Sequence, residues 1–345
     1  MPDMRFAPPN PLRIADRASG LNAPGIRSYN ERLVLSLLLQ NEGTTRLEIG
    51  EKTGLSAQTI SVIVRSLEAE GLVAKGEAQR GRAGPPTIPV MLNPEGAFAI
   101  GVSFGRSAMD VVVIDFAGGM RFHKSHLYSS GDGEALLGAA VQEAVKAVPG
   151  NLLPRLAGIG IAVPDDANMG PGAARILGDL TRTRAVLEAQ FGMDVFVQNE
   201  IASVAGGEML FGGGRHLSDF VYFYLGSKLH SRLVLKHQIY SGPANVSIDV
   251  GLSRLAETAE PDEIDLWAKE CSAQIGATVT SLLGFVELQA IVLSTHAPAA
   301  VLDRLQLEMK KLNSTIRIAA GTQALAPKAW GAATLPYHSR FMTTD

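Results

Sequence analysis

The sequence lacks the features of disulfide-bonded, zinc-stabilised, membrane-spanning and secreted proteins. It contains one cysteine, Cys271, among 345 residues. A single thiol cannot form an internal disulfide, and it leaves no thiolate cluster for a structural zinc ion. No apolar run reaches the roughly 18 residues of a membrane span, and the first twenty residues lack the apolar core of a secretion signal. We therefore expect a protein of the reducing cytoplasm that does not enter a membrane.

The sequence also has no excess of basic residues. It carries 31 Lys and Arg against 34 Asp and Glu, a formal net charge of -3. Any nucleic-acid-binding surface must therefore be local. Hydrophobic residues make up 46% of the chain and charged residues 19%, so the chain should fold, and its length suits two or three domains.

Helix-start signals follow a Pro/Gly-rich segment, residues 1–27, which we expect to be a flexible arm. Ser28 with Glu31 and Thr45 with Glu48 have the spacing of capping boxes, and Ser56 is a third candidate N-cap. These signals predict helices from 28 to about 41, from 45 to 54, and from 56 to 71.

The third predicted helix is amphipathic, with an unusual polar side. Its apolar residues Ile60, Ile63, Val64 and Leu67 repeat at helical spacing and should face inward. Together with the helix before it, across a "TGLS" turn, it predicts a helix-turn-helix, whose second helix presents short polar side chains to base edges. An ordinary three-helix bundle with a polar surface is the alternative. The candidate DNA-contacting residues on this helix are Ser56, Ala57, Gln58, Thr59, Ser61 and Arg65.

The segment from Gly71 to Pro94 reads as strand, turn and strand, which is typical of the wing of a winged helix. Arg80 and Arg82 lie in its "QRGRAGPP" turn, where they would suit a narrow, A·T-rich minor groove. An interdomain linker is the alternative for this segment alone. The sequence thus predicts a winged helix-turn-helix DNA-binding domain over 28–94.

After Pro94 the pattern changes to strands alternating with helices, which predicts an α/β domain over 95–345. A similar order restarts near residue 219, so we expect two lobes, 95–198 plus the C-terminal helix and 199–322, with a small-ligand cleft between them. Helices are predicted over 133–148, from 201, over 262–285 and over 298–312. Strands are predicted over 97–105, 108–118, 120–128, 156–164, 194–200, 219–227, 231–240, 290–294 and 316–320.

A set of motifs spread along the chain resembles the ROK family of repressors, open reading frames and kinases. They are the "RGR" of the wing, "LNPEGAFAIGVSFGR", "GIGIAVP", "NEIASVAGGE" and a terminal "GAA". The resemblance covers nearly the whole chain from about residue 28. It implies a two-lobed actin- and hexokinase-like fold of the ribonuclease H-like type. Members of this family with a winged helix are mostly repressors of sugar catabolism genes.

The positions that match the family's kinase motifs have changed. The first phosphate loop, D-x-G-G-T, corresponds to residues 103–107, which read "SFGRS", and the second, G-T-G-x-G, to residues 226–230, which read "GSKLH". The catalytic aspartate corresponds to Glu200. The family's zinc-binding residues have no counterpart in "PANVSIDVGLSRLAE". The resemblance therefore implies a domain without kinase activity, metal or cofactor.

Asn199 and Glu200 are the only matched sugar-contacting positions that stay polar. They are candidate effector-binding residues, although a cap and first helical turn would need the same residue types. Glu208 is expected to be a solvated helix residue.

We predict a regulator that binds operator DNA and represses carbohydrate-uptake or catabolism genes, possesses no catalytic residues, and responds to a sugar or sugar derivative. Half-site geometry favours a homodimer or homotetramer. The alternatives are a sugar kinase, or a protein-interaction module with a vestigial DNA-binding domain.

Overall fold

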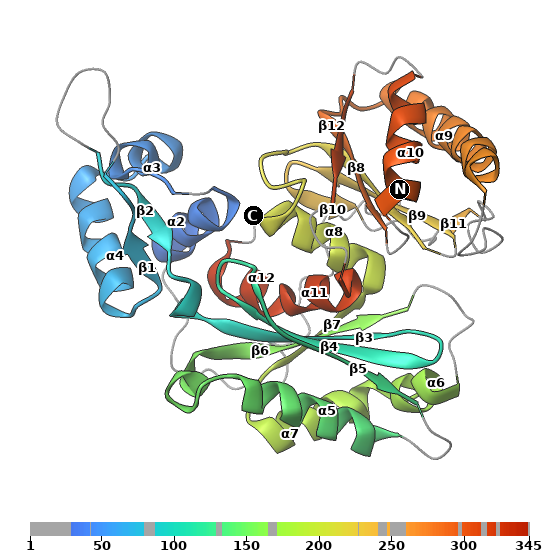
Figure 1. Cartoon of the computed structure of the whole chain (residues 1–345). Helices are drawn as coiled ribbons and strands as arrows, with labels where there is room; N and C mark the ends of the chain where they lie inside the picture. Colours follow the sequence, from blue (N-terminus) through green and yellow to red (C-terminus); the bar gives the residue numbers. More distant parts are fainter. Residues whose placement is uncertain are drawn as a thin grey trace, which may run out of the picture. The chain divides into compact units, whose positions relative to one another are not determined.

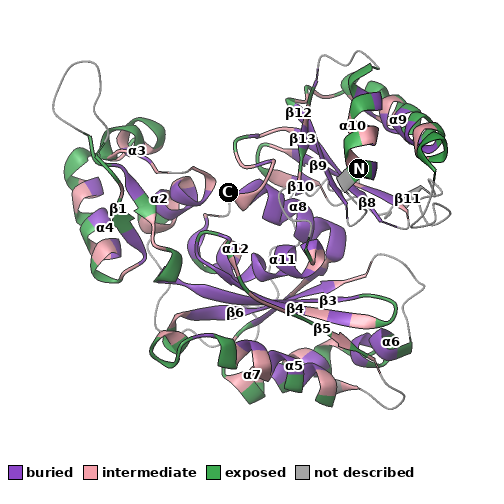
Figure 2. Ribbon diagram, in the orientation of Figure 1, coloured by how far each residue is buried: buried purple, intermediate pink, exposed green. Residues whose placement is uncertain are grey.

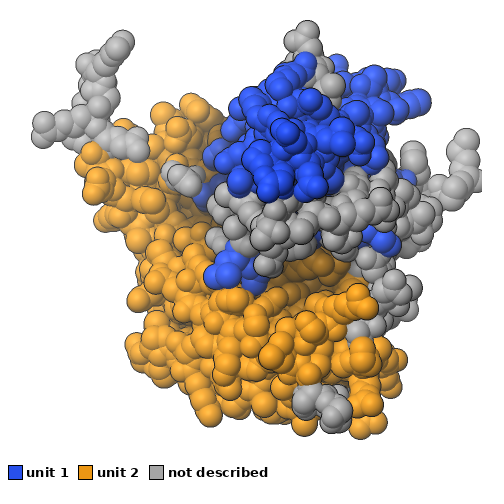
Figure 3. Space-filling view, turned by 45° about the vertical axis from the view of Figure 1, so that its right-hand side comes forward, with its two compact units in different colours: residues 1–8, 212–327 blue, residues 9–211, 328–345 orange. Residues whose placement is uncertain are grey.

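The computed structural model describes residues 29–41, 43–78, 87–128, 133–164, 171–226, 228–240, 247–248, 260–295, 299–311, 316–321 and 325–343. Within these ranges the chain forms two compact units (Figure 3). Unit 2 contains the described residues up to Phe211 and those from Lys328 onward, and unit 1 contains the stretch from Gly212 to Pro327. The division falls after the helix that follows Asn199, so that helix goes with unit 2.

The N-terminal part of unit 2 is a winged helix-turn-helix, as predicted. It has the antiparallel strand pair β1–β2 after three helices. These elements are α2 (Tyr29–Gln40), α3 (Arg46–Thr53), α4 (Ala57–Ala69), β1 (Val73–Lys75) and β2 (Val90–Leu92). Their shared core is apolar and buried, and consists mainly of Val34, Leu35, Leu38, Leu39, Ile49, Ile60, Val64 and Leu67.

Local hydrogen bonds fix where these helices begin and end. Thr45 and Glu48 form the predicted capping box, which satisfies free N–H groups at the start of α3. The hydrogen bonds from the Thr45 backbone and hydroxyl also hold the pKa of Glu48 below its usual value. Gly54 ends α3 in the left-handed region, with φ 71°. The other predicted box includes Ser28, which lies outside the described residues.

The rest of unit 2 is built on a five-stranded sheet of order β5-β4-β3-β6-β7. The strands β3, β6 and β7 are parallel, and β4 and β5 continue from β3 as an antiparallel meander. The sheet consists of β3 (Phe98–Phe104), β4 (Ala108–Asp115), β5 (Met120–Leu127), β6 (Leu156–Val163) and β7 (Val195–Asn199). A 3-10 turn, η1 (Pro94–Gly96), leads from the wing into β3. All five strands lie where the sequence predicted them.

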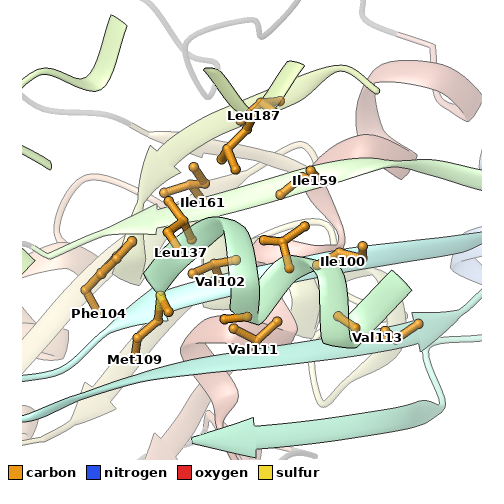
Figure 4. Close-up of a cluster of buried hydrophobic side chains, with 14 of the residues drawn as sticks. Ile100, Val102, Phe104, Met109, Val111, Val113, Leu137, Ile159, Ile161 and Leu187 are labelled. Atoms are coloured by element: carbon orange, nitrogen blue, oxygen red, sulfur yellow. The ribbon is translucent and has the colours of Figure 1, made fainter. Parts of the chain in front are cut away.

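Helices cover both faces of this sheet (Figure 1). On one face, α5 (Glu134–Ala147), α6 (Pro171–Leu177) and α7 (Leu180–Phe191) enclose a core with Val102, Val111, Leu137, Ile161 and Leu187 (Figure 4). The other face carries α8 (Glu200–Phe211), α11 (Pro327–Ala333) and α12 (Leu335–Phe341). Neither α6 nor α7 was predicted, because their apolar residues do not keep a clear helical period.

The helix α8 corrects one expectation. All its residues from Glu200 to Leu210 are buried, as Figure 2 shows. Glu208 is therefore not a solvated residue, because its exposed fraction is 0%. A helix that is buried on every side gives no amphipathic pattern from which an exposed face could be predicted.

The helix α11 approaches the sheet unusually closely because glycines line the contact. A Cβ added at Gly101 or Gly160 would overlap a carbonyl oxygen of α11. The Trp330 indole donates a hydrogen bond to the Gly118 carbonyl at 2.9 Å. The Tyr337 hydroxyl lies 3.2 Å from the Ile114 carbonyl oxygen, a hydrogen bond that ties α12 to β4. The last two helices are thus an integral part of the core of unit 2.

The same C-terminal segment holds the first helix of the winged domain. The Arg32 guanidinium donates to the Ser339 carbonyl at 3.0 Å, and the Thr343 N–H donates to the Ser36 hydroxyl at 2.9 Å. Near them, burial lowers the pKa of His338 to about 4, so this imidazole is neutral at pH 7. The C-terminal residues therefore contact both α2 and the sheet.

A second attachment joins the end of the winged domain to the sheet. In η2 (Gly150–Arg155), the guanidinium of Arg155 donates to the carbonyls of Gly71 and Glu95 at 3.2 and 3.0 Å. Asn93 also donates to the Gly71 carbonyl, at 2.7 Å. Gly71 follows α4, so these bonds fix the chain at the end of that helix.

Unit 1 has a sheet of order β10-β9-β8-β12-β13, with β11 paired to β9. Its elements are β8 (Phe220–Leu225), β9 (Leu229–Leu235), β10 (Gln238–Tyr240), β11 (Ser247–Ile248), α9 (Pro261–Leu283), β12 (Ala290–Thr295), α10 (Ala299–Lys311) and β13 (Arg317–Ala320). The single strand predicted over 231–240 is wrong. A turn at Lys236 and His237, both with positive φ, divides it into β9 and β10.

None of the described helices is both long and apolar enough to cross a membrane.

Because α11 lies so close to the sheet, we expect Gly160 to tolerate no side chain. A Gly160→Ala substitution should lower the melting temperature of unit 2 by roughly 5–10 °C, since the new methyl group forces α11 from the sheet at a cost of about 3 kcal/mol. Gly150→Ala is the matched control, because its Cβ would meet nothing within 4 Å. Equal melting temperatures for the two variants, measured by circular dichroism, would contradict the packing described.

Candidate nucleic-acid interface

The helix α4 lies at the surface of the winged domain with its apolar side inward. Ile60, Ile63, Val64 and Leu67 are buried, as their spacing predicted. Ala57, Gln58 and Arg65 are exposed on the other side, whereas Thr59 and Ser61 are half-buried. The structure therefore exposes Ala57, Gln58 and Arg65 and exposes Thr59 and Ser61 only in part.

Hydrogen bonds within α4 already engage three of the candidate hydroxyl groups. Ser56 is the N-cap, and its hydroxyl accepts from the Thr59 N–H at 3.1 Å. The Ser56 and Thr59 hydroxyls also bond each other at 2.9 Å. The Ser61 hydroxyl donates to the Ala57 carbonyl at 2.8 Å. These bonds hold the hydroxyls at the start of the helix and use part of their hydrogen-bonding capacity.

Gln58 and Arg65 are better placed to reach a partner outside the protein. The Gln58 amide makes no hydrogen bond to any other described residue. The Arg65 Nε donates to the Ser61 carbonyl at 3.0 Å, which supports the side chain along the helix while its two terminal nitrogens stay available. An amide and a guanidinium are the groups that make paired hydrogen bonds to purines.

Sequence reasoning missed one exposed residue on this side. Val62 is 55% exposed, although it is apolar. It follows Gln58 by four residues and precedes Arg65 by three, so the three side chains share one face. Val62 is apolar, so it was not among the hydrogen-bonding candidates. The sequence does show that it lies outside the helical repeat of Ile60, Ile63, Val64 and Leu67.

The electrostatics of α4 favour an anion. Its first turn contains no acidic residue, and the helix N-terminus carries a partial positive charge. The carboxylate of Glu68, further along the helix, lies 3.7 Å from the Arg46 guanidinium of α3. The first turn of α4 itself therefore adds no negative charge that would repel a phosphate.

The two wing arginines, Arg80 and Arg82, lie outside the described residues. The structure describes the strands that flank them, β1 and β2, and an isolated bridge from Thr44 to Val90 that extends this small sheet.

The residues that match the kinase phosphate loops occupy ordinary turns and strands. Ser103 is buried in β3, and residues 105–107 form the exposed turn before β4. In unit 1, the Gly226 N–H donates to the Lys228 carbonyl at 2.9 Å, and the next residues, Leu229 and His230, are buried in β9. Ser227 lies outside the described residues.

Asn199 ends β7, and Glu200 begins α8. The side-chain oxygen of Asn199 accepts from the N–H groups of Ile201 and Ala202 at 2.9 and 3.1 Å, so it caps the helix. The buried Glu200 carboxylate lies 2.8 Å from the ammonium of Lys328 in α11. Among the described residues, no three His, Cys, Asp or Glu side chains gather where they could hold a metal ion.

Two substitutions at Ser56 test whether its hydroxyl acts as a helix cap. Ser56→Ala should destabilise the winged domain by about 1 kcal/mol because the Thr59 N–H loses its acceptor. Ser56→Asn, which can still cap the helix, should restore most of that loss. Thermal unfolding of the two variants beside the wild type measures this. If the asparagine variant is as unstable as the alanine variant, capping is not what Ser56 contributes.

Comparison with known proteins identifies the N-terminal domain and gives relatives over a longer stretch of the chain. A model described as a winged helix-turn-helix DNA-binding family matches residues 27–74. The xylose repressor of Caldicellulosiruptor bescii is 25% identical over 235 residues, which are 66% of this chain and 58% of the repressor. The xylose repressor of Bacillus spizizenii is 26% identical over 240 residues, or 66% and 60% of the two chains. The chain thus spans less than two thirds of the length of these curated relatives.

Two solved structures share the fold. A ROK family transcriptional regulator, a homologue of the Escherichia coli MLC protein, has a TM-score of 0.61 and 13% identity, covering 91% of this chain and 96% of its own. The ROK hexokinase of Thermus thermophilus has a TM-score of 0.51 and 15% identity, covering 70% and 98%. The predicted resemblance is therefore confirmed: the chain combines a winged helix-turn-helix with an actin-like α/β body, the fold of ROK family transcriptional regulators.

Proposed function

We propose that the protein binds operator DNA and represses genes of carbohydrate uptake or catabolism. The observation that carries this proposal is the exposed side of α4, which presents Gln58 and Arg65 and has no acidic residue in its first turn. Such a helix in a winged helix-turn-helix enters the major groove. The xylose repressors among the relatives support a sugar-related set of genes.

DNA contacts would come from α4 and from the wing. Ser56, Ala57, Thr59 and Ser61 line the start of the helix and would approach the phosphate backbone and nearby base edges. Arg80 and Arg82 would add minor-groove contacts. One such domain covers too few base pairs for a specific site, so the protein acts as a homodimer or homotetramer in the cytoplasm.

The body of the protein would work as an effector domain without catalysis. Glu200 stands where the kinases have their base, but its carboxylate is paired with Lys328 and would have to break a buried ion pair to accept a proton. Arg106 in the first phosphate loop and the buried Leu229 in the second also oppose nucleotide binding. No cofactor is part of the proposal.

A sugar or sugar derivative is the proposed effector, and Asn199 and Glu200 are the residues to test for its binding. A hydroxyl group that bonds the Glu200 carboxylate would compete with the Lys328 ammonium. Because α11 continues into α12, which holds α2 through Arg32, a change at Lys328 could reach the DNA-binding domain. The effector would bind the arrangement with the Glu200–Lys328 ion pair and the arrangement without it with different affinities. The size of that difference would set how far the effector changes DNA affinity.

Selection of duplex DNA tests the DNA-binding function. The full-length protein should enrich a palindromic site from sheared genomic DNA. Arg65→Ala should weaken binding to that site by about 1–3 kcal/mol and relax the preference at one position, if the guanidinium bonds a guanine through two atoms. Affinity is measured by fluorescence anisotropy at several salt concentrations, since phosphate contacts depend on salt.

Arg182→Ala removes the same charge from an exposed position on α7 and is the control. It should bind the selected site as the wild type does. Equal affinity and equal salt dependence for Arg65→Ala and the wild type would place the recognition surface elsewhere, and failure to enrich any site would contradict the proposed function itself.

A coupled assay for ADP release tests the absence of catalysis. The wild type, offered a panel of hexoses and pentoses with ATP and Mg²⁺, should release ADP no faster than the no-protein control. Turnover that Glu200→Ala abolishes would show instead that the protein is a sugar kinase, the main alternative.

A further inference from the structure

The exposed side of α4 carries a stripe of three residues, Gln58, Val62 and Arg65, which we call the recognition stripe. At 100° per residue, their side chains lie within about 60° of one another around the helix axis. All three are exposed. The stripe therefore combines two hydrogen-bonding groups with an apolar group between them.

The valine has no structural reason to be in that place. The inward side of α4 is already filled by Ile60, Ile63, Val64 and Leu67. An exposed β-branched residue within a helix is less favourable than Ala, Gln, Lys or Arg, because its side chain loses rotational freedom. Val62 therefore leaves an apolar side chain in water without contributing to the buried core.

Two polar side chains near Val62 are held by hydrogen bonds to the backbone of their own helix. The Ser61 hydroxyl is bonded to the Ala57 carbonyl, and the Arg65 Nε is bonded to the Ser61 carbonyl. Both interactions run along the helix and hold these side chains close to its surface. Val62 lies along the helix between Gln58 and Arg65, and 55% of the residue is exposed.

We propose that Val62 is a specificity-determining residue that contacts the C5 methyl group of a thymine in the major groove. This inference rests on the proposed DNA-binding function. Thymine is the one standard base that presents a methyl group in the major groove, and small apolar side chains recognise it there. The residue one turn earlier, Gln58, carries the amide that bonds the N6 and N7 atoms of adenine. The stripe therefore favours an A·T-containing half-site.

The test uses the DNA site that the full-length protein selects from a randomised duplex library. Each thymine in a half-site is replaced singly by deoxyuridine, which removes only the C5 methyl group. The wild type should bind about fourfold more weakly when one particular thymine is replaced, the effect of one lost methyl contact. A G·5-methylcytosine pair at that position should bind more tightly than the unmethylated G·C pair.

The variant Val62→Ala should bind the unmodified site about fourfold or more weakly and should show no further loss on the uracil site. Val186→Ala, which shortens a valine that is 38% exposed on α7, is the matched control and should keep the full uracil effect. Circular dichroism should show that neither variant melts below the wild type, because neither side chain lies in the core and alanine is the better helix former.

Two outcomes would overturn the inference and are distinct from failure of the proposed function. The wild type could be indifferent to uracil at every thymine, or Val62→Ala could lose as much affinity on the uracil site as the wild type does. In either case specific DNA binding would stand while the role of Val62 would not. If the library yields no preferred site at all, both the function and the inference fail.

Discussion

The contact between α11 and the sheet of unit 2 is the constraint on which the other features depend. Gly101 and Gly160 let the backbone of α11 approach the two central strands, where a single methyl group would overlap it. This approach places Trp330 and Tyr337 within hydrogen-bonding distance of carbonyls on the sheet side. It also sets the position of α12, whose backbone and following residues bond α2. The helices of the winged domain are therefore attached to a packed interface.

The attachment has two points with different chemistry. At the beginning of the winged domain, Arg32 and Ser36 bond backbone groups of the C-terminal segment. At its end, Arg155 bonds two carbonyls that flank the wing. Hydrogen bonds of this kind contribute about 1 kcal/mol each, with somewhat more for a charged donor. A difference of a few such bonds is comparable with the coupling energy of a regulatory protein.

The sequence predicted features that depend on local chemistry. The Thr45–Glu48 box, the Ser56 cap and the inward period of α4 follow from neighbours a few residues apart, and the structure has all three. The prediction for Glu208 was wrong because α8 is buried on every side. The turn at Lys236 and His237 was missed because it has no glycine or asparagine, the residues that indicate such a turn. The pairing of Glu200 with Lys328 joins distant parts of the chain, so no local pattern contains it.

The division of unit 2 into two stretches of sequence affects how the protein is made. A ribosome completes α2, the sheet strands and α8 first, then all of unit 1, and only afterwards α11 and α12. Until those last helices emerge, the glycine-lined face of β3 and β6 lacks its cover, and α2 lacks its C-terminal partner. The described part of unit 1 lies within one stretch, Gly212–Pro327, so it can fold before α11 and α12 are made. The nascent chain thus exposes this surface until α11 and α12 are made, and exposed apolar surface of this kind promotes aggregation of a partly folded chain.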